Sequence, residues 1–199
     1  MDKRATTGVP VHDIIARRWS PRAYDASRPV AREMLTALFE AARWAPSCYG
    51  DQPWRYLVWD RHADAQSWQR AFVCLAEGNQ VWVRNAPVLL LAMAASRFSH
   101  NGKENRWGIY DTGAASENLC LQATALGLQA HQMGGFDEHA VRGAFSVPEE
   151  YACMAMIAVG YPTDAPILEG ELAQMEAAPR KRAPLGERFF EAEWGCGWE

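Results

Sequence analysis

One continuous apolar run, residues 87–93, constrains the fold of this chain more than any other feature. Polar residues bound the run at Asn85 and Ser96, so its length suits a short strand that is buried on both faces. Residues 111–126 carry apolar side chains on nearly every side of a helical projection, and Gly127 is a suitable helix stop. The chain should therefore bury both helices and strands in one core.

The other expected elements alternate irregularly along the chain. They comprise helices at 11–18, 31–44, 62–77 and 137–145, strands at 55–60, 128–133 and 153–159, and a polar loop at 96–107. This order favours an α+β sandwich over a doubly wound fold. The chain contains neither a GxGxxG motif after a strand nor a GxxxxGK[ST] motif, so Rossmann and Walker nucleotide sites lack support.

The C-terminal part differs in composition from the rest of the chain. At 199 residues one domain is the default, and we expect it to span residues 1–165. Residues 166–199 are rich in charge, proline and glycine, but they also contain aromatic residues, which disordered tails usually lack. We therefore expect a C-terminal extension that packs on the same domain or on a partner subunit.

Charge and cysteine content exclude several classes of function. A net charge of −4 argues against a nucleic acid as the main partner. The five cysteines are odd in number and widely spaced, which predicts free thiols in a reducing cytoplasm and no disulfide framework or metal site. We expect no signal peptide, because no apolar segment follows the charged residues 2–4, and the longest apolar run, residues 86–95, is too short to span a membrane.

Two short segments carry the candidate chemistry. Three arginines and a serine cluster in residues 17–22, which suggests a local anion site in an otherwise acidic chain. Residues 45–54 break a helix with one proline and end near another, so this loop can lie flat against a ligand. Together they suit the phosphate and ring of a mononucleotide such as FMN. The plainer alternatives are a solvated basic face and a simple helix-to-strand turn.

Four segments in register resemble the FMN-dependent nitroreductase family. They are Arg-Arg-Trp-Ser-Pro-Arg-Ala-Tyr-Asp at 17–25, the stretch at 40–55 with its Ala-Pro-Ser and Gln-Pro-Trp-Arg, Gly-Gly-Phe-Asp at 134–137, and Ala-Val-Gly-Tyr-Pro at 158–162. The resemblance implies an α+β sandwich with a mostly antiparallel central sheet flanked by helices. It also implies an intertwined homodimer that holds two FMN molecules at the subunit interface.

The resemblance assigns a cofactor contact to each of several residues. It places Arg18 and Ser20 on the flavin phosphate, Arg22 near the pyrimidine edge of the ring, and backbone contacts at Trp19. A basic pair after the last strand, Arg180 and Arg182, also reaches the phosphate. A loop from the other subunit covers the ring, through Pro46, Ser47 and Cys48. Backbone N–H groups near flavin N5 and O4 would come from Gly134 and Gly135.

The loop departs from the family pattern at one position. Gly50 stands where the family usually has an asparagine, so any contact of Gly50 with the ring is through its backbone. Cys48 replaces a serine and is interpreted as a structural thiol, because no histidine is placed beside it. His131 lies in an apolar segment and is interpreted as a core or pocket-wall histidine.

The implied activity is an oxidoreductase that works in a ping-pong cycle. NAD(P)H reduces the bound flavin and leaves, and an electron-poor small molecule such as a nitroaromatic or a quinone then takes its place. The flavin carries the chemistry, so no catalytic side chain is assigned. Two alternatives stay open: an FMN-binding or regulatory module with little turnover, and a related flavin reaction such as dehalogenation or ene reduction.

Overall fold

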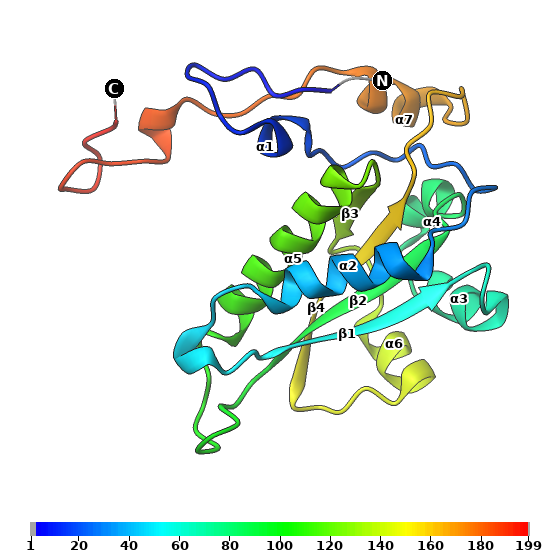
Figure 1. The fold of residues 1–199 in the computed structure, drawn as a ribbon, viewed down its shortest axis with the longest axis horizontal. Helices are drawn as coiled ribbons and strands as arrows, with labels where there is room; N and C mark the ends of the chain where they lie inside the picture. The colour runs from blue at the N-terminus through cyan, green and yellow to red at the C-terminus, as the bar shows by residue number, and fades with distance from the viewer. Residues whose placement is uncertain (1–2, 199) are drawn as a thin grey trace.

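An antiparallel sheet forms the centre of the molecule (Figure 1). The computed structural model describes residues 3–198, and within this range the sheet has four strands in the order β1-β2-β4-β3. The strands are β1 Trp54–Asp60, β2 Val88–Ala95, β3 Gln129–Met133 and β4 Tyr151–Gly160. The two middle strands, β2 and β4, are the most apolar by sequence, as burial on both faces requires.

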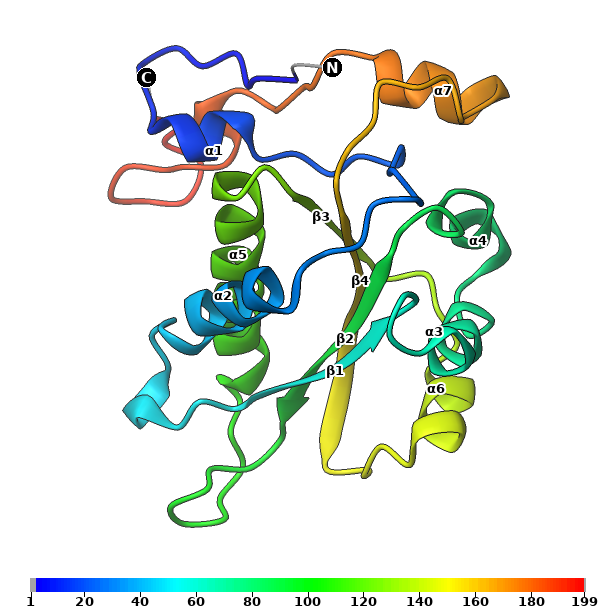
Figure 2. The same ribbon diagram turned by 45° about the vertical axis from the view of Figure 1, so that its right-hand side comes forward.

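Helices cover both faces of this sheet, which confirms the α+β sandwich (Figures 1 and 2). One face carries α2 Arg32–Arg43 and α5 Gly108–Ala125, and the other carries α3 Ala65–Phe72, α4 Glu77–Val83 and α6 Glu138–Phe145. Successive residues of β2 face opposite cores: Leu89 joins the core that contains Trp82 of α4, whereas Leu90 joins the core that contains Leu119 of α5. The core therefore has two halves, one on each side of the sheet.

The helix expected at 62–77 is too long: α3 covers only Ala65–Phe72, and a second helix, α4, begins at Glu77 after a break. Asp64 begins α3 by accepting hydrogen bonds from the backbone N–H groups of Gln66 and Ser67. At the break, the Ala76 N–H donates to the carbonyl of Gly135 at 3.0 Å. This bond joins residues that are far apart in the sequence, so no local pattern predicts it.

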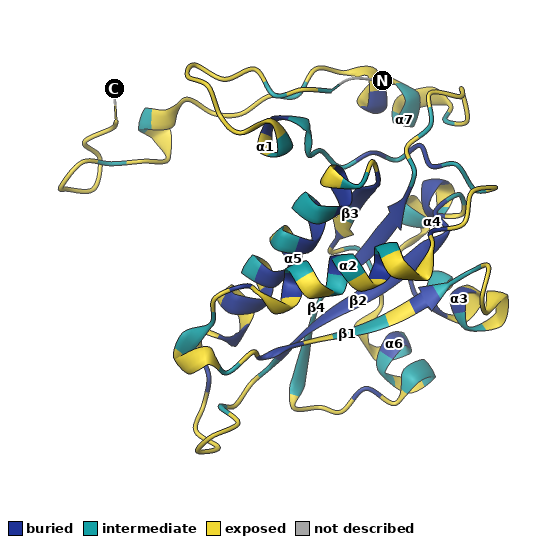
Figure 3. Ribbon diagram, viewed as in Figure 1, coloured by how far each residue is buried: buried dark blue, intermediate teal, exposed yellow. Residues whose placement is uncertain are grey.

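The N-terminal and C-terminal segments lie outside the two helical layers and run along one end of the domain (Figures 1 and 3). They include α1 Asp13–Arg17, α7 Gly170–Ala177 and the short 3-10 helix η2 Leu185–Glu187. Beyond η2 the tail exposes large aromatic side chains, with Phe189 at 59% and Trp194 at 91%. Within the described residues all five cysteines are free, and no helix is long and apolar enough to cross a membrane.

Candidate functional site

Five cationic side chains from both ends of the chain surround one small cavity. The cavity has a volume of about 230 Å³, and its lining includes Lys3, Arg18, Arg22, Arg180 and Arg182. Trp19 and Ser20 also line it. The structure thus brings the predicted residues of the first segment together with the predicted C-terminal pair, although about 160 positions separate them in the sequence. We call these five cations the arginine clamp.

Hydrogen bonds hold Arg18 and Arg180 of the clamp in place. The Arg18 backbone N–H closes α1 by donating to the carbonyl of Ile14, and its guanidinium lies 3.4 Å from the hydroxyl of Ser20. Arg180 donates from Nη1 to the carbonyls of Lys3 at 3.0 Å and Ala16 at 2.8 Å. Arg180 therefore ties the C-terminal segment to the N-terminal one, in addition to its place in the cavity wall.

The cations of the clamp outnumber the acidic side chains that form ion pairs with them. Among residues 3–198, Glu117 is the one acid that pairs with a clamp arginine, at 3.4 Å from Arg18, and its side chain is half exposed. Burial, and then the charges of Arg18 and Arg182, lower the pKa of the Arg180 guanidinium. A dianion such as a phosphate monoester matches this excess, because guanidinium groups bind its oxygens through charge-assisted hydrogen bonds.

A neutral histidine supports the backbone below the clamp. His131 of β3 lies with Nδ1 at 2.9 Å from the Pro21 carbonyl, and its ring packs on Trp82 at 4.5 Å. Burial lowers the pKa of His131 to about 4, and the charges of Arg22 and Arg18 act in the same direction. The imidazole is therefore uncharged at neutral pH, and Nδ1 donates its proton to the carbonyl. This burial against Trp82 agrees with the interpretation of His131 as a core histidine.

The second predicted segment forms a strained loop around the 3-10 helix η1 Cys48–Gly50. Pro46, Ser47 and Gly50 line a separate cavity of about 420 Å³, whereas Cys48 does not. The Cys48 backbone N–H donates to the buried carboxylate of Asp111 at 3.0 Å, so the start of α5 fixes the loop. Gly50 has φ +65 and open space around its Cα, a conformation that suits glycine or asparagine.

An aromatic cluster ties this loop to the polar loop at 96–107. Tyr49 has a positive φ of 56 and is 83% exposed, and its ring contacts Phe98 at 5.8 Å and His100 at 5.4 Å. The carboxylate of Asp51 accepts from the Ser99 hydroxyl at 2.6 Å. Burial opposes ionisation of Asp51, but the hydrogen bonds from Ser99 and the nearby His100 outweigh it and lower its pKa. The two loops therefore form one unit.

The predicted glycine pair lies at the end of β3, beside the start of α4. The Gly135 carbonyl accepts from the Ala76 N–H and from the Asn79 side-chain amide at 2.9 Å. A Cβ on Gly135 would lie only 2.8 Å from Asn79 Nδ2, so a larger residue here would displace the Asn79 amide. Gly134 has no atom within 4 Å of such a Cβ, which leaves room for a ligand.

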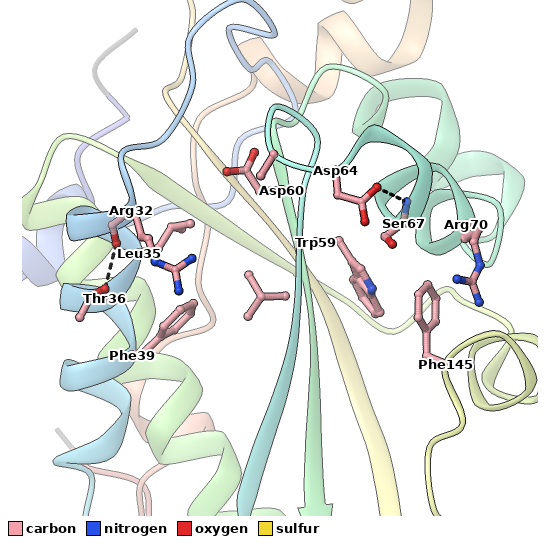
Figure 4. Close-up of a pocket in the computed structure, with 12 residues that line it drawn as sticks. Arg32, Leu35, Thr36, Phe39, Trp59, Asp60, Asp64, Ser67, Arg70 and Phe145 are labelled. Carbon is pink, nitrogen blue, oxygen red and sulfur yellow. Dashed lines mark hydrogen bonds between the residues drawn. The ribbon is translucent and has the colours of Figure 1, made fainter.

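The predicted residues do not all meet within one chain. The cavity of the arginine clamp and the cavity of the loop share no lining residue. The loop and α1 also lie well apart in the fold (Figure 1). A larger cavity, of about 610 Å³, contains none of the predicted residues and lies beside β1, between Phe39 of α2 and Ser67 of α3 (Figure 4).

Two residues could not be identified from the sequence pattern: Lys3, which belongs to the clamp, and Glu176, which supports it. Lys3 lines the cavity, and its ammonium group donates to the carbonyl of Glu176 at 2.5 Å. The Glu176 carboxylate is buried and accepts from the backbone N–H groups of Arg22 and Ala23. A lone lysine near the N-terminus is not distinctive. Glu176 lies in α7, a helix that the sequence did not lead us to expect.

Comparisons with known proteins bear on the family and the fold of this chain. The model of the nitroreductase family matches residues 15–161. A solved oxidoreductase containing FMN is 36% identical, with a TM-score of 0.90, over 98% of this chain and 97% of that one. A Desulfovibrio desulfuricans protein solved in complex with FMN is 28% identical, with a TM-score of 0.71, over 94% of this chain and 99% of that one.

A relative found by sequence also covers most of the chain. The NADH dehydrogenase of Thermus thermophilus is 28% identical over 200 residues, which cover 85% of this chain and 89% of that protein. The matched region of the family model contains the first arginine segment from Arg17 onward, the proline-bounded loop and the glycine pair. With a family model that spans most of its length and a solved structure that follows almost its whole fold, this chain belongs to the nitroreductase family.

Proposed function

We propose that this chain is an FMN-dependent oxidoreductase that takes electrons from NAD(P)H and reduces electron-poor small molecules such as nitroaromatics or quinones. One observation carries the proposal: five cations line a cavity of about 230 Å³. Among the described residues, a single carboxylate, that of Glu117, forms an ion pair with one of their arginines. FMN ends in a phosphate monoester, which fits this excess of positive charge. FMN is named in two of the structural relatives, and NADH in the sequence relative.

Each part of the site has a distinct task in this proposal. When bound, FMN supplies the hydride chemistry, and the protein supplies binding and orientation. Arg18, Arg182 and Ser20 hold the phosphate. The loop at 46–50 covers one face of the ring, and Gly134 allows close approach of the backbone to its edge. No side chain has to move a proton, and we assign no catalytic residue.

We propose a homodimer in which the loop of one subunit covers the flavin that the partner's clamp holds. Large apolar side chains near the loop and the start of α5 support this assembly, because they are exposed in the single chain. Their exposed fractions are 77% for Trp44, 55% for Ile109 and 78% for Tyr110. The exposed aromatic residues of the tail are further candidates for burial on the partner. The free thiols suit a cytoplasmic location.

Anaerobic mixing of the FMN-loaded protein with NADH or NADPH tests the activity. Prompt bleaching of the flavin absorbance, followed by its return when a quinone or nitroaromatic is added, is the expected result. A flavin that stays oxidised with both donors would contradict the proposal. That outcome would favour the second candidate, an FMN-binding or regulatory module with little turnover. The replacement of the family's asparagine by Gly50 favours this candidate, because the ring loses a side-chain amide contact.

A further inference from the structure

One peptide unit below the clamp is held from both sides. The carbonyl of Pro21 accepts a hydrogen bond from His131 Nδ1 at 2.9 Å. The N–H of Arg22, which belongs to the same peptide unit, donates to both carboxylate oxygens of Glu176 at 3.0 Å. The next N–H, that of Ala23, donates to Glu176 Oε1 at 3.1 Å. The hydrogen bonds therefore run in one direction, from the imidazole through the peptide to the carboxylate, and such chains polarise one another.

The Glu176 carboxylate is an unusual acceptor at this place. Glu176 is 7% exposed, and among residues 3–198 no Lys or Arg side chain forms an ion pair with its carboxylate. A buried carboxylate is costly unless hydrogen bonds compensate it, so the N–H groups of Arg22 and Ala23 are what keep it in place. Conversely, the carboxylate fixes the orientation of the backbone that carries Ser20 and Arg22.

Glu176 also lies next to the other half of the clamp. It belongs to the last turn of α7, and Arg180 and Arg182 follow within six residues. The Lys3 ammonium group donates to the carbonyls of Glu176 and Ala178, so this cation of the clamp is also held at the end of α7. One side chain thus joins residues 18–22, which precede the sheet, to residues 180–182, which follow it.

We propose that Glu176 is a positioning residue: it binds no ligand itself, and it sets the geometry in which the arginine clamp recognises a phosphate, with His131 holding the opposite side of the same peptide. This inference rests on the proposed function, in which the phosphate is that of FMN. The negative charge of Glu176 makes the inference testable, because a positioning role and a purely electrostatic role predict opposite effects on FMN binding. A negative charge near the clamp repels a phosphate, so removing that charge without any change of geometry would strengthen FMN binding. A positioning role predicts the opposite.

The test compares FMN with riboflavin, which has the same ring and no phosphate. Dissociation constants of both ligands would be measured by flavin fluorescence on the flavin-free full-length protein. Glu176→Gln keeps the size of the side chain but loses the charge and one acceptor. Glu176→Asp keeps the charge but is one methylene too short to reach both N–H groups. Glu171→Gln, on the exposed side of the same helix, is the matched control.

The expected result is a loss of FMN affinity of at least about tenfold in both Glu176 variants, the factor for one charge-assisted hydrogen bond. Riboflavin affinity and the control variant should stay unchanged. FMN affinity that is unchanged or higher in Glu176→Gln would overturn the inference. Equal FMN and riboflavin affinities in the wild type would instead overturn the proposed function, because the clamp would then not recognise a phosphate.

A second measurement on the wild type covers the case in which a Glu176 variant fails to fold. FMN should slow amide hydrogen exchange at Arg22 and Ala23 and at residues 176–182 together, because ligand and carboxylate order the same backbone. Riboflavin should not slow exchange at these amides. Protection by FMN of residues 18–23 without residues 176–182 would contradict a coupling through Glu176.

Discussion

The two halves of the candidate site differ in how far a single chain completes them. The arginine clamp is assembled within one chain: Arg18 and Arg182 line one cavity, and the peptide beneath them is hydrogen-bonded on both sides. The loop at 46–50 is equally well anchored, through Cys48 to Asp111, but its cavity opens elsewhere and is flanked by exposed aromatic side chains. This difference is what the proposed dimer would produce, with the phosphate end of the site built in one subunit and the ring cover supplied by the other.

The largest expected effect is on the clamp. Arg18→Ala combined with Arg182→Ala should weaken FMN binding by roughly 10²- to 10⁴-fold, because each charge-assisted phosphate contact is worth about 1.5–3 kcal/mol. Equilibrium dialysis against FMN and riboflavin measures this, and riboflavin binding should change little. Arg188→Ala, an exposed arginine of the same tail, is the control. Full FMN occupancy in the double variant would show that the phosphate binds elsewhere.

The clamp side should also be the more sensitive to mild acid. The pKa of His131 is lowered to about 4, below its ordinary value near 6.5. Between these two values the unfolded chain binds a proton that the folded chain does not bind, so stability falls as the pH drops from 6.5 to 4, by roughly 3 kcal/mol. The clamp charges of Arg18 and Arg22 oppose protonation, while Glu176 faces the far side of the peptide.

Urea unfolding of wild type and His131→Asn between pH 7 and 4.5 checks this prediction. The asparagine amide can still donate to the Pro21 carbonyl but does not titrate, so the stability of the variant should depend less on pH. Asp51, on the loop side, has a lowered pKa and therefore loses its contribution only below its ordinary value of 3.8. An identical pH dependence in both proteins would refute the role of His131.

Loosening the loop should have a smaller and different effect. Asp111→Ala removes the acceptor of the Cys48 N–H and should lower the free energy of unfolding by about 1.5–3 kcal/mol. FMN and riboflavin should both bind more weakly and by the same factor, because in the proposed site the loop contacts the ring that they share. A loss confined to FMN would show that the loop acts on the phosphate and would remove the distinction between the two halves.

The smallest effect is expected at Gly50. Gly50→Asn should change the stability of the fold by less than about 1 kcal/mol, because asparagine tolerates its positive φ and nothing lies within 4 Å of the new Cβ. The restored amide should strengthen binding of both flavins a few-fold. Calorimetric unfolding and the two flavin titrations measure these changes, and weaker flavin binding would place Gly50 away from the ring edge.

Much of the fold could be predicted from local patterns. The strands β1 to β4 agree with the expected strands to within two residues at each end, because each forms an apolar run with clear boundaries. The break between α3 and α4 could not be predicted, since it depends on a hydrogen bond from Ala76 to the distant Gly135. The helix α7 could not be predicted either, because it lacks the apolar stripe by which a helix is recognised in a sequence.

The candidate site also combines residues that a local pattern predicts with residues that only tertiary contacts bring together. The arginines of residues 17–22 form a dense local pattern, so the sequence suggested an anion site before any fold was known. Glu176 and Lys3 belong to the same site only through tertiary contacts, and a single acid or lysine carries no local signal. Every assigned cofactor contact is still a prediction, and the loop residues and the glycine pair also lie outside the clamp cavity.

A mixed dimer tests the central claim, a site shared between two subunits, most directly. One subunit would carry the clamp change Arg18→Ala with Arg182→Ala, and the other would carry Ser47→Trp, which fills the loop cavity. Two affinity tags allow the mixed dimer to be purified, and its FMN content is then titrated. A shared site predicts one tight FMN site in the mixed dimer, formed by one intact clamp and one intact loop, and none in either parent dimer. A mixed dimer that binds FMN no better than its parents would contradict the shared site.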